Sequence, residues 1–418
     1  MPAVLLGRLE ARAHDGLSEE RAAEAARADD AVEISVVMPC LDEERTLGAC
    51  VAKARAALDT IGAPYEIIVA DNGSTDASVR IAKEGGARVV AVARRGYGSA
   101  LRAGIEAARG QLIVMGDADD SYDFGGIAPF VEKLRGGADL VMGNRFKGGI
   151  APGAMPWMHR YVGNPLLSGL LNLLFHTPIG DSHCGLRAFR KRAYVSWGLS
   201  APGMEFASEM VVRACLLGHV VTEVPTTLKK DGRDRPPHLR SFRDGWRHLR
   251  FLLLASPRWL YLVPSSLLLV VGFGLMALVT PGPLPIGNHH GLDLQTMLFG
   301  SLCVLLGYQT LWLWAFAKVF GWITGFLPEQ TFSENAFRWM NLERGLLLGA
   351  LLLLAGLGLD GWIAFTWLRS GFGQLAQETT MRVLLWGSTA IVLGVQTVYG
   401  SFFLSMLGMA HRARTEPG

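Results

Sequence analysis

The sequence predicts an α/β domain followed by a domain of membrane-spanning helices, and two observations support this prediction. In the first half, short apolar runs alternate with stretches of helical periodicity, which is typical of a mostly parallel sheet covered by helices. In the second half, four apolar runs each approach the ~20 residues that a helix needs to cross a bilayer. Nearly all charged residues precede about residue 258, so the two halves also differ in composition.

Length and composition limit the possible classes of function. With 418 residues, the chain exceeds one ordinary domain, and its net charge of +3 is too small to indicate nucleic acid as a partner. The five cysteines are scattered without C-x-x-C spacing, so the sequence indicates neither a disulfide framework nor a zinc site. Reduced thiols facing the cytosol fit this usage best.

The first half begins with a leader, residues 1–32, which is rich in Ala, Arg and Glu and lacks the pattern of a secretory signal. The expected strands are 34–38, 66–70, 88–93, 111–115, 139–142 and 220–224. The expected helices are 46–61, the stretch after Ser99 as far as Arg109, 126–135 and 205–217. Pro39 is expected to end the first strand, and much of 146–257 is expected to form Gly- and Pro-rich loops.

The expected membrane spans are Leu260–Thr280, Leu294–Val319, Gly345–Trp367 and Val383–Met409. The loop 281–293 has no Lys or Arg, whereas the stretch before the first span and the C-terminal tail are basic. The positive-inside rule therefore predicts a multi-pass protein of the plasma membrane, with the α/β domain and the C-terminus in the cytoplasm. Residues 241–257 alternate basic and bulky apolar residues, which favours a helix lying among interfacial membrane lipids over an ordinary surface helix.

Asp117 and Asp119 form the acidic pattern that organises the first half. They follow the apolar run 111–115, and residues two apart in an extended segment point the same way. Two carboxylates on one side suit a divalent cation with open positions for phosphate oxygens, although an acidic surface turn is the simpler alternative. Further polar turns, 39–44, 71–76 and 95–98, also follow expected strands, where open α/β sheets bind ligands.

These four turns, in this order and spacing, closely resemble the inverting family 2 glycosyltransferases with the GT-A (Rossmann-like) fold. Within that group, the sequence is similar to dolichyl- and polyprenyl-phosphate sugar synthases, and the apolar runs match the branch with C-terminal transmembrane helices. We therefore expect a leader (1–32), a GT-A domain (33–240), an interfacial helix (241–257), a transmembrane domain of four helices (258–410) and a cytoplasmic tail (411–418).

The resemblance implies donor-side roles. It implies that Asp117 and Asp119 bind Mg²⁺ or Mn²⁺ on the donor diphosphate, and that Asp119 is catalytic. Asn72 stands where the family more often has Asp, and Ser121 stands where a Gln is common, so the third metal ligand is open. The implied nucleotide-sugar-binding residues are Pro39, Leu41, Glu43, Asp71, Gly96, Asp117 and Ala118.

The acceptor side needs positive charge more than a strong base, because a phosphate acceptor is already an anionic nucleophile. The resemblance implies that Asp181 is the acceptor-side carboxylate, as a base or an orienting group, and that Arg145 is a catalytic partner. Each of the arginines, taken alone, could equally be a solvated surface charge. The implied acceptor-phosphate-binding residues are Arg145, Lys147, Arg160, Arg187 and Arg235.

The leading functional hypothesis is transfer of one hexose from a nucleotide sugar, with UDP-glucose favoured and GDP-mannose next, to undecaprenyl or dolichyl phosphate with inversion. One alternative is a transferase acting on a lipid hydroxyl, and another is a polysaccharide synthase, although its Q-x-x-R-W signature is missing from the sequence. A flippase or scaffold with a degenerate transferase domain is a non-enzymatic alternative, which the intact acidic pair disfavours. Association of the transmembrane helices into a homo-oligomer is a further expectation.

Overall fold

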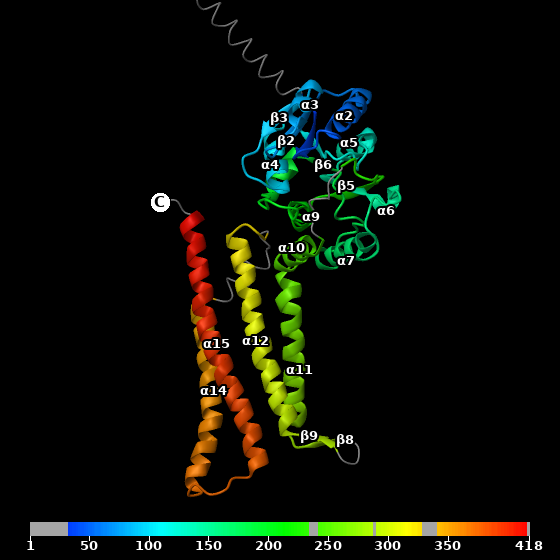
Figure 1. Ribbon diagram of the computed structural model, residues 1–418. Coiled ribbons are helices and arrows are strands. Elements are labelled where there is room, and N and C mark those ends of the chain that lie inside the picture. The colour runs from blue at the N-terminus through cyan, green and yellow to red at the C-terminus, as the bar shows by residue number, and fades with distance from the viewer. Residues whose placement is uncertain (1–31, 234–240, 287–289, 328–340, 416–418) are drawn as a thin grey trace, which may run out of the picture. The chain divides into compact units, whose positions relative to one another are not determined.

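The computed structural model describes residues 32–233, 241–286, 290–327 and 341–415 (Figure 1). The chain divides into two compact units, Met1–Leu252 and Leu253–Gly418. Among the predicted features, the leader up to residue 31, Arg235 and the last residues of the tail lie outside the described residues.

The first unit is built on a seven-stranded sheet with the order β3-β2-β1-β4-β6-β5-β7. β6 runs antiparallel to both β4 and β5, while the other neighbouring pairs are parallel. The carboxyl ends of the other strands therefore share one edge of the sheet with the start of β6. The strands are β1 (Ile34–Cys40), β2 (Tyr65–Asp71), β3 (Arg88–Ala91), β4 (Leu112–Met115), β5 (Leu140–Asn144), β6 (Arg187–Arg190) and β7 (Val221–Pro225).

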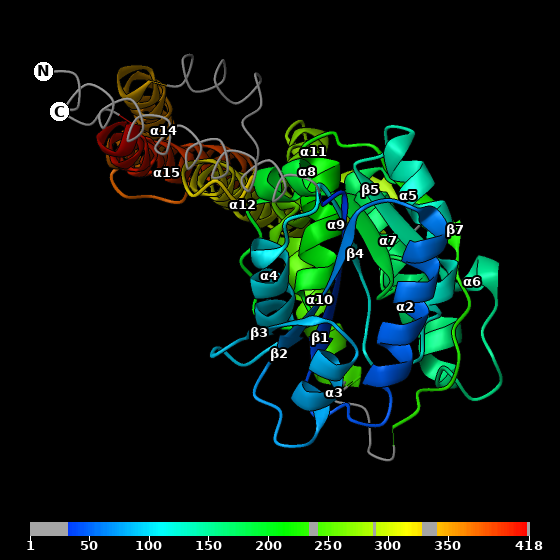
Figure 2. The same cartoon turned by 90° about the horizontal axis from the view of Figure 1, so that it is seen from above.

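Helices cover both faces of this sheet (Figure 2). Along β1, Val36 and Met38 pack in the apolar cluster that includes the buried residues of α2, whereas Val37 on the opposite face contacts Gly104 of α4. The helices of the unit are α2 (Leu47–Ile61), α3 (Ser78–Glu84), α4 (Tyr97–Ala107), η1 (Phe124–Gly126), α5 (Ala128–Arg135), α6 (Arg145–Gly148), η2 (His159–Gly163), α7 (Asn164–Phe175), α8 (Lys191–Trp197), α9 (Phe206–Leu216) and α10 (Ser241–Leu254).

The structure corrects the predicted end of the first strand. β1 continues through Pro39, which pairs with Ala70 of β2 in the parallel ladder. The pairing of β1 with β4 stops at Val37 and Met115, so Pro39 has a neighbouring strand on one side only. A proline is tolerated at such an edge-like position because its missing N–H is not needed there.

The segment predicted to be irregular contains the strand β6 and the helical elements α6, η2, α7 and α8, which the sequence pattern did not reveal. β6 holds only Ala188 and Phe189 between Arg187 and Arg190, which is too short an apolar run for strand periodicity. Its insertion between β4 and β5 makes the sheet mixed, although most of its pairings are parallel as predicted. Helices α7 and α8 were also not predicted.

The predicted interfacial helix 241–257 overlaps α10, which has two different faces. His248 and Leu252 are buried, whereas Trp246 and Leu254 are more than half exposed. Both kinds of face are required for a helix that packs on a domain and also meets a lipid surface, but contact with lipid stays a prediction.

The second unit consists mainly of long apolar helices. Ser301 and Thr389 (2.7 Å), together with Tyr308 and Thr397 (2.6 Å), join α12 to α15 through side-chain hydrogen bonds. Among the described residues, four stretches are long and apolar enough to cross a membrane, and each overlaps one predicted span: Arg258–Val279, Leu294–Ile323, Leu342–Arg369 and Glu378–Met409. The elements are η3 (Arg258–Leu262), α11 (Val263–Val279), β8 (Leu284–Ile286), β9 (His290–Leu292), α12 (Leu294–Ile323), α14 (Leu342–Arg369) and α15 (Gln377–Thr415).

Candidate active site

The acidic pair Asp117 and Asp119 lies directly after β4, at the carboxyl edge of the sheet. The Asp119 carboxylate accepts hydrogen bonds from the backbone N–H (3.1 Å) and the hydroxyl (2.6 Å) of Ser121. Loop residue Gly185 packs so closely that a Cβ atom at this position would lie 2.5 Å from Oδ2 of Asp117. Burial and the charge of Asp119 raise the pKa of Asp117 to about 6.

These oxygen donors fit a divalent cation. Two carboxylates that are crowded and partly buried repel each other, and a hard cation relieves that repulsion. In the described part of the chain, no cluster of three or more His, Cys, Asp or Glu side chains is arranged to hold a metal. Two carboxylates fill only part of the coordination sphere of Mg²⁺ or Mn²⁺, so a cation on Asp117 and Asp119 would keep positions for other oxygen ligands, such as those of a diphosphate.

The loops after β1 and β2 are tied together beside this pair. The backbone N–H of Asp42 donates to Ser74 Oγ (2.9 Å), and Asp42 Oδ1 accepts from the N–H of Thr75 (2.7 Å). Thr46 Oγ1 donates to the carbonyl of Ala118 (2.8 Å), which links these loops to the acidic pair. The structure thus gathers at one edge the predicted residues Pro39, Leu41, Glu43, Asp71, Asp117, Ala118 and Asp119.

Asp71 and Asn72 have different surroundings. The carboxylate of Asp71 accepts hydrogen bonds from the N–H groups of Gly73 and Ser74 (both 3.2 Å). The Asn72 side chain donates to two carbonyls of the segment after β3 and accepts from the N–H of Gly96 (2.7 Å). Asn72 thereby holds the Gly96 turn in place, which gives this departure from the family pattern a structural reason.

The Gly96 turn requires glycine at this position. Its φ of +137° lies in a region that L-residues rarely adopt, and a Cβ atom would lie 2.3 Å from the carbonyl oxygen of Pro202. The predicted glycine therefore allows the turn to approach the loop before α9. Contact of Gly96 with a nucleotide sugar stays a prediction.

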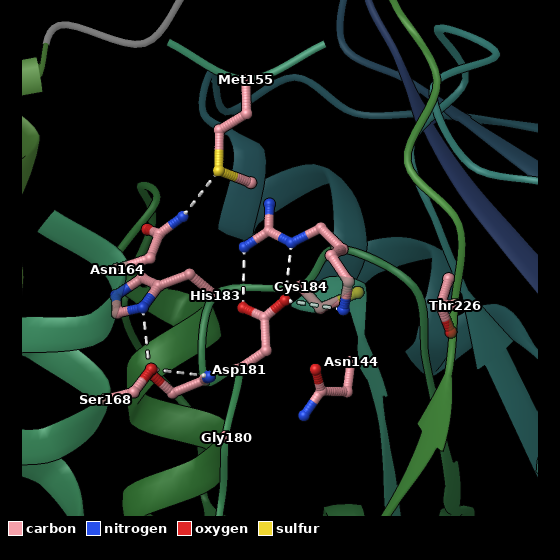
Figure 3. A network of polar contacts seen from close by, with 12 residues as sticks. Asn144, Met155, Asn164, Ser168, Gly180, Asp181, His183, Cys184 and Thr226 are labelled. Atoms are coloured by element: carbon pink, nitrogen blue, oxygen red, sulfur yellow. Dashed lines mark hydrogen bonds and ion pairs between the residues drawn. The ribbon is translucent and has the colours of Figure 1, made fainter. Parts of the chain in front are cut away.

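Arg145 and Asp181 form a buried ion pair across the sheet edge (Figure 3). Arg145 Nε donates to Asp181 Oδ2 and Nη2 donates to Oδ1, both at 2.7 Å, and the Arg145 backbone N–H donates to Oδ2 at 3.0 Å. Asp181 is fully buried, and Arg145 is 8% exposed. Since three donors from Arg145 occupy both oxygens of Asp181, the geometry suits an orienting group better than a general base.

Tyr122 connects this ion pair to the acidic pair, and sequence reasoning missed it. Its hydroxyl accepts from the N–H of Gly185 (2.8 Å), while Nη1 of Arg145 lies 3.5 Å away. Gly185 in turn packs against Asp117. Tyr122 lies in the same acidic stretch as Asp117, but the sequence of that stretch gives no sign that its hydroxyl contacts Gly185 and Arg145.

The predicted contact of Arg187 with an acceptor phosphate is wrong. Arg187 is fully buried at the start of β6, and its guanidinium donates to the carbonyls of Ser182, Cys184 and Ala207. Because backbone oxygens take donors from all three guanidinium nitrogens, Arg187 fixes the 181–185 loop against α9 and cannot reach a ligand.

Lys147 and Arg160, the other predicted cationic residues that the structure describes, remain accessible at least in part. Lys147 Nζ lies 2.8 Å from Glu223 Oε2, with its side chain 60% exposed. Arg160 lies over the ring of Tyr161, 5.4 Å from its centroid. Burial, followed by the charge of Arg145, lowers the pKa of His159, so the start of η2 lies within electrostatic reach of Arg145. Arg235 lies outside the described residues.

Arg233 begins a basic run that, by the family resemblance, corresponds to a loop that closes over the donor and acceptor phosphates in relatives, and its side chain lies beside Glu43 and Asp119. Its Nη2 lies 2.7 Å from Glu43 Oε1 and 3.3 Å from Asp119 Oδ2. Its Nε also donates to Glu43 Oε2 at 3.1 Å. Neither the density of positive charge in this run nor the family resemblance singles out one arginine.

Helix α7 holds the 181–185 loop from behind. Ser168 Oγ accepts from the N–H of Ser182 (3.1 Å), and the two hydroxyls lie 3.0 Å apart. Ser182 Oγ also lies 2.9 Å from Nδ1 of His183 (Figure 3). The loop that carries Asp181 is thereby attached to the buried side of α7.

The opposite side of α7 and the preceding η2 present a large apolar surface. Soluble monomers rarely expose bulky apolar side chains in such continuity, so this surface indicates a partner or a lipid surface. It is called the η2/α7 face below, and its residues, with their exposed fractions, are Trp157 (69%), Met158 (46%), Tyr161 (60%), Val162 (45%), Leu166 (66%) and Leu173 (53%).

Two family models match the chain. One, glycosyl transferase family 2, matches residues 35–197, and the other, glycosyltransferase family 2 C-terminal transmembrane region, matches residues 315–408. The low-salt glycan biosynthesis hexosyltransferase Agl6 of Haloferax volcanii is 38% identical over 388 residues, which cover 92% of this chain and 91% of that protein.

Two further proteins show narrower similarity. The dolichyl-phosphate hexose transferase of Haloferax volcanii is 30% identical over 199 residues, 46% of this chain and 81% of that protein. A crystal structure of glucosyl-3-phosphoglycerate synthase from Mycobacterium tuberculosis, with Mn²⁺, UDP and phosphoglyceric acid, is 23% identical. It covers 55% of this chain and 78% of its own, with a TM-score of 0.42.

Proposed function

Because the chain belongs to glycosyltransferase family 2 and is a membrane hexosyltransferase with a GT-A domain, we propose that it transfers one hexose to the phosphate of a polyprenyl lipid. The acceptor is undecaprenyl or dolichyl phosphate, and the donor is a nucleotide sugar, UDP-glucose first and GDP-mannose next. The observation that carries this proposal is one sheet edge where the acidic pair Asp117 and Asp119 lies beside the buried Arg145. The similarity to a dolichyl-phosphate hexose transferase supports the lipid phosphate as acceptor.

On the donor side, the loops after β1 and β2 bind the nucleoside, with Asp71 close to the base. Asp117 and Asp119 hold Mg²⁺ or Mn²⁺, for which their crowded carboxylates are suited. When bound, the cation stabilises negative charge on the departing diphosphate as a Lewis acid. Ser121 contributes by holding Asp119 through its hydroxyl and backbone N–H.

On the acceptor side, Arg145 is the positioning cation. Asp181 fixes two of its guanidinium nitrogens, and Nη1 faces Tyr122 on the side of the acidic pair. A lipid phosphate bound near Nη1 attacks the anomeric carbon with one of its anionic oxygens. The new C–O bond forms as the bond to the nucleoside diphosphate breaks on the opposite face, which inverts the anomeric centre. No strong base is required, because the phosphate oxygen carries no proton that must be removed.

The η2/α7 face explains how a membrane-bound acceptor reaches this site. Its aromatic and aliphatic side chains suit the interfacial zone of a bilayer, and Arg160 on the same stretch suits anionic lipid headgroups. The face is the other side of the helix that holds the Asp181 loop, so lipid contact and phosphate positioning use one element. By the positive-inside rule, the basic stretches of the chain support a cytoplasmic location for this unit.

The test is a transfer assay with the purified full chain in detergent. Radiolabelled UDP- and GDP-sugars are offered with undecaprenyl phosphate, dolichyl phosphate or diacylglycerol, in Mg²⁺, Mn²⁺ or EDTA. We expect one labelled lipid that is labile to mild acid and forms only with a cation. The matched pair of variants is Asp119→Ala, which should be inactive, and Asp123→Ala, which changes an exposed carboxylate further along the loop.

Each outcome decides one part of the proposal. Label on diacylglycerol would replace the phosphate acceptor with a lipid hydroxyl, and label in a polymer would indicate a polysaccharide synthase. Transfer that persists in EDTA would contradict the metal assignment. Failure of every donor would contradict the function as proposed.

A further inference from the structure

Segment Leu228–Arg233 runs along the loop that carries the acidic pair and delivers a positive charge to it. Backbone contacts fix the register of this segment against the loop 119–122. The backbone of Arg233 is therefore held next to the acidic pair. These contacts are an antiparallel bridge of Leu228 with Tyr122, Lys229 N to Ser121 O (2.9 Å) and Gly232 N to Asp119 O (3.1 Å).

The guanidinium of Arg233 is shared between Glu43 and Asp119. Two nitrogens bind the two oxygens of Glu43, at 2.7 and 3.1 Å, and one of them also lies 3.3 Å from Asp119 Oδ2. The side chains are 16% exposed for Arg233, 5% for Glu43 and 11% for Asp119, so water screens the charges only weakly. The arginine thus neutralises one of the two carboxylates that are suited to a metal.

Arg233 should affect the binding of a free cation differently from the binding of a cation–diphosphate complex. A free divalent ion must overcome the repulsion of the guanidinium next to Asp119. A metal–nucleotide complex brings phosphate oxygens, and a guanidinium binds such oxygens through charge-assisted hydrogen bonds. Glu43 would keep the arginine close to the site in both cases.

Building on the proposed function, we infer that Arg233 is a positioning residue that occupies the cation side of Asp119 until a metal–nucleotide complex takes its place. Arg233 then moves from the Asp119 carboxylate to the diphosphate. It therefore opposes binding of a free cation and favours binding of the metal with a nucleoside diphosphate. The site would load the two components together and hold free metal weakly.

The test measures binding, not transfer, on the full chain in detergent. Electron paramagnetic resonance gives the affinity for Mn²⁺ without nucleotide, and calorimetry gives the affinities for UDP and GDP in saturating Mn²⁺. For Arg233→Gln we expect Mn²⁺ to bind about fivefold or more tightly, and the preferred nucleotide to bind about fivefold or more weakly, at the lower end of typical coupling between sites. Arg233→Lys keeps the charge and should stay closer to the wild type in both measurements.

Lys229→Gln is the matched control, because it removes a positive charge from the same segment. The Nζ atom of Lys229 lies 3.8 Å from Asp123 Oδ2 and not beside Asp119. We expect it to change either affinity by less than about twofold, since exposed ion pairs contribute little. Circular dichroism and the melting temperature check that each variant is folded.

Unchanged or weaker Mn²⁺ binding by folded Arg233→Gln would overturn the inference. Equally tighter Mn²⁺ binding by Lys229→Gln would also overturn it, because any loss of positive charge nearby would then have the same effect. If neither the wild type nor Arg233→Gln binds Mn²⁺, with or without a nucleoside diphosphate, the inference and the proposed metal site fail together. Opposite shifts in the two affinities support the inference even if no hexose transfer is found, in which case only the proposed reaction is overturned.

Discussion

The donor side and the acceptor side of this site are built in different ways. On the donor side, Asp71 ends β2 and Asp119 lies in the turn after β4, and hydrogen bonds from residues two or three positions later hold them. On the acceptor side, Arg145 depends on Asp181, which lies 36 residues away and is fully buried. A side chain held locally can be changed at little cost to folding, whereas one in a buried long-range ion pair supports both the fold and the reaction.

The largest effect should come from breaking the acceptor-side pair. Arg145→Gln leaves the carboxylate of Asp181 buried without its charge partner, which should cost about 3–5 kcal/mol of stability and abolish transfer. The measurements are the melting temperature in detergent and the transfer rate. Arg135→Gln is the control, because its ion pair with Glu33 is exposed and should contribute about 1 kcal/mol or less. If Arg145→Gln melted at the wild-type temperature, the acceptor side would not depend on this ion pair for stability, and the proposed difference between the two sides would be wrong.

The donor side should lose activity without losing stability. Asp119→Asn keeps an oxygen that can accept from Ser121, but removes the charge that suits a metal, so transfer should fall about 10²- to 10³-fold. The melting temperature should change little. Asp120→Asn makes the same chemical change at the next residue, whose φ of +60° an asparagine also tolerates, and should retain most activity. Equal losses in both variants would argue against a specific role for Asp119.

Glu66 lies away from the proposed site and also binds charged and polar partners. Changing it tests how much such a buried carboxylate contributes to stability without a role in the reaction. Glu66 accepts from Arg109 N (2.6 Å), Arg88 Nη2 (2.7 Å) and Ser35 Oγ (2.9 Å). Burial alone would raise the pKa of Glu66, but the hydrogen bonds from Arg109 and Arg88 hold it below its ordinary value of 4.5. The stabilisation is therefore complete above about pH 4.5 and is lost as the pH falls through the lowered pKa.

Glu66→Gln should accordingly cost about 1.5–3 kcal/mol at pH 7 and leave the KM for the lipid acceptor unchanged. The difference in melting temperature between wild type and variant should shrink as the pH is lowered from 7 to 3.5. A difference that does not vary with pH would show that the charge of Glu66 is not what stabilises the network.

The smallest effect should come from the accessible part of the acceptor side. Arg160→Gln removes a charge that we propose binds the acceptor phosphate, next to the η2/α7 face. It should raise the KM for polyprenyl phosphate about tenfold at unchanged stability, the loss of roughly 1.4 kcal/mol. Arg192→Gln, on the exposed surface of α8, should leave KM unchanged. A fall in kcat at constant KM would place Arg160 in the chemical step instead.

The sequence alone was sufficient for the features that depend on neighbouring residues. The apolar runs of β1, β2 and β4 and the polar turns after them are local patterns, so the donor-side residues could be located before the structure was known. The four candidate spans follow from length and hydropathy, which are also local properties. The short charged strand β6 lacks such a pattern. In α7, leucines lie on the buried side (Leu171, Leu174) and on the exposed side (Leu166, Leu173), so no single apolar face predicts the helix.

Only the tertiary structure decided which charged side chains lie at the proposed site and which are enclosed in the fold. Arg145 and Arg187 received the same predicted role, but one faces the site beside Tyr122 and the other is enclosed by carbonyl groups. Arg233 meets Glu43 across 190 residues of chain. An arginine has the same charge in every sequence context, and its function depends on partners and burial, which are set when distant segments pack together.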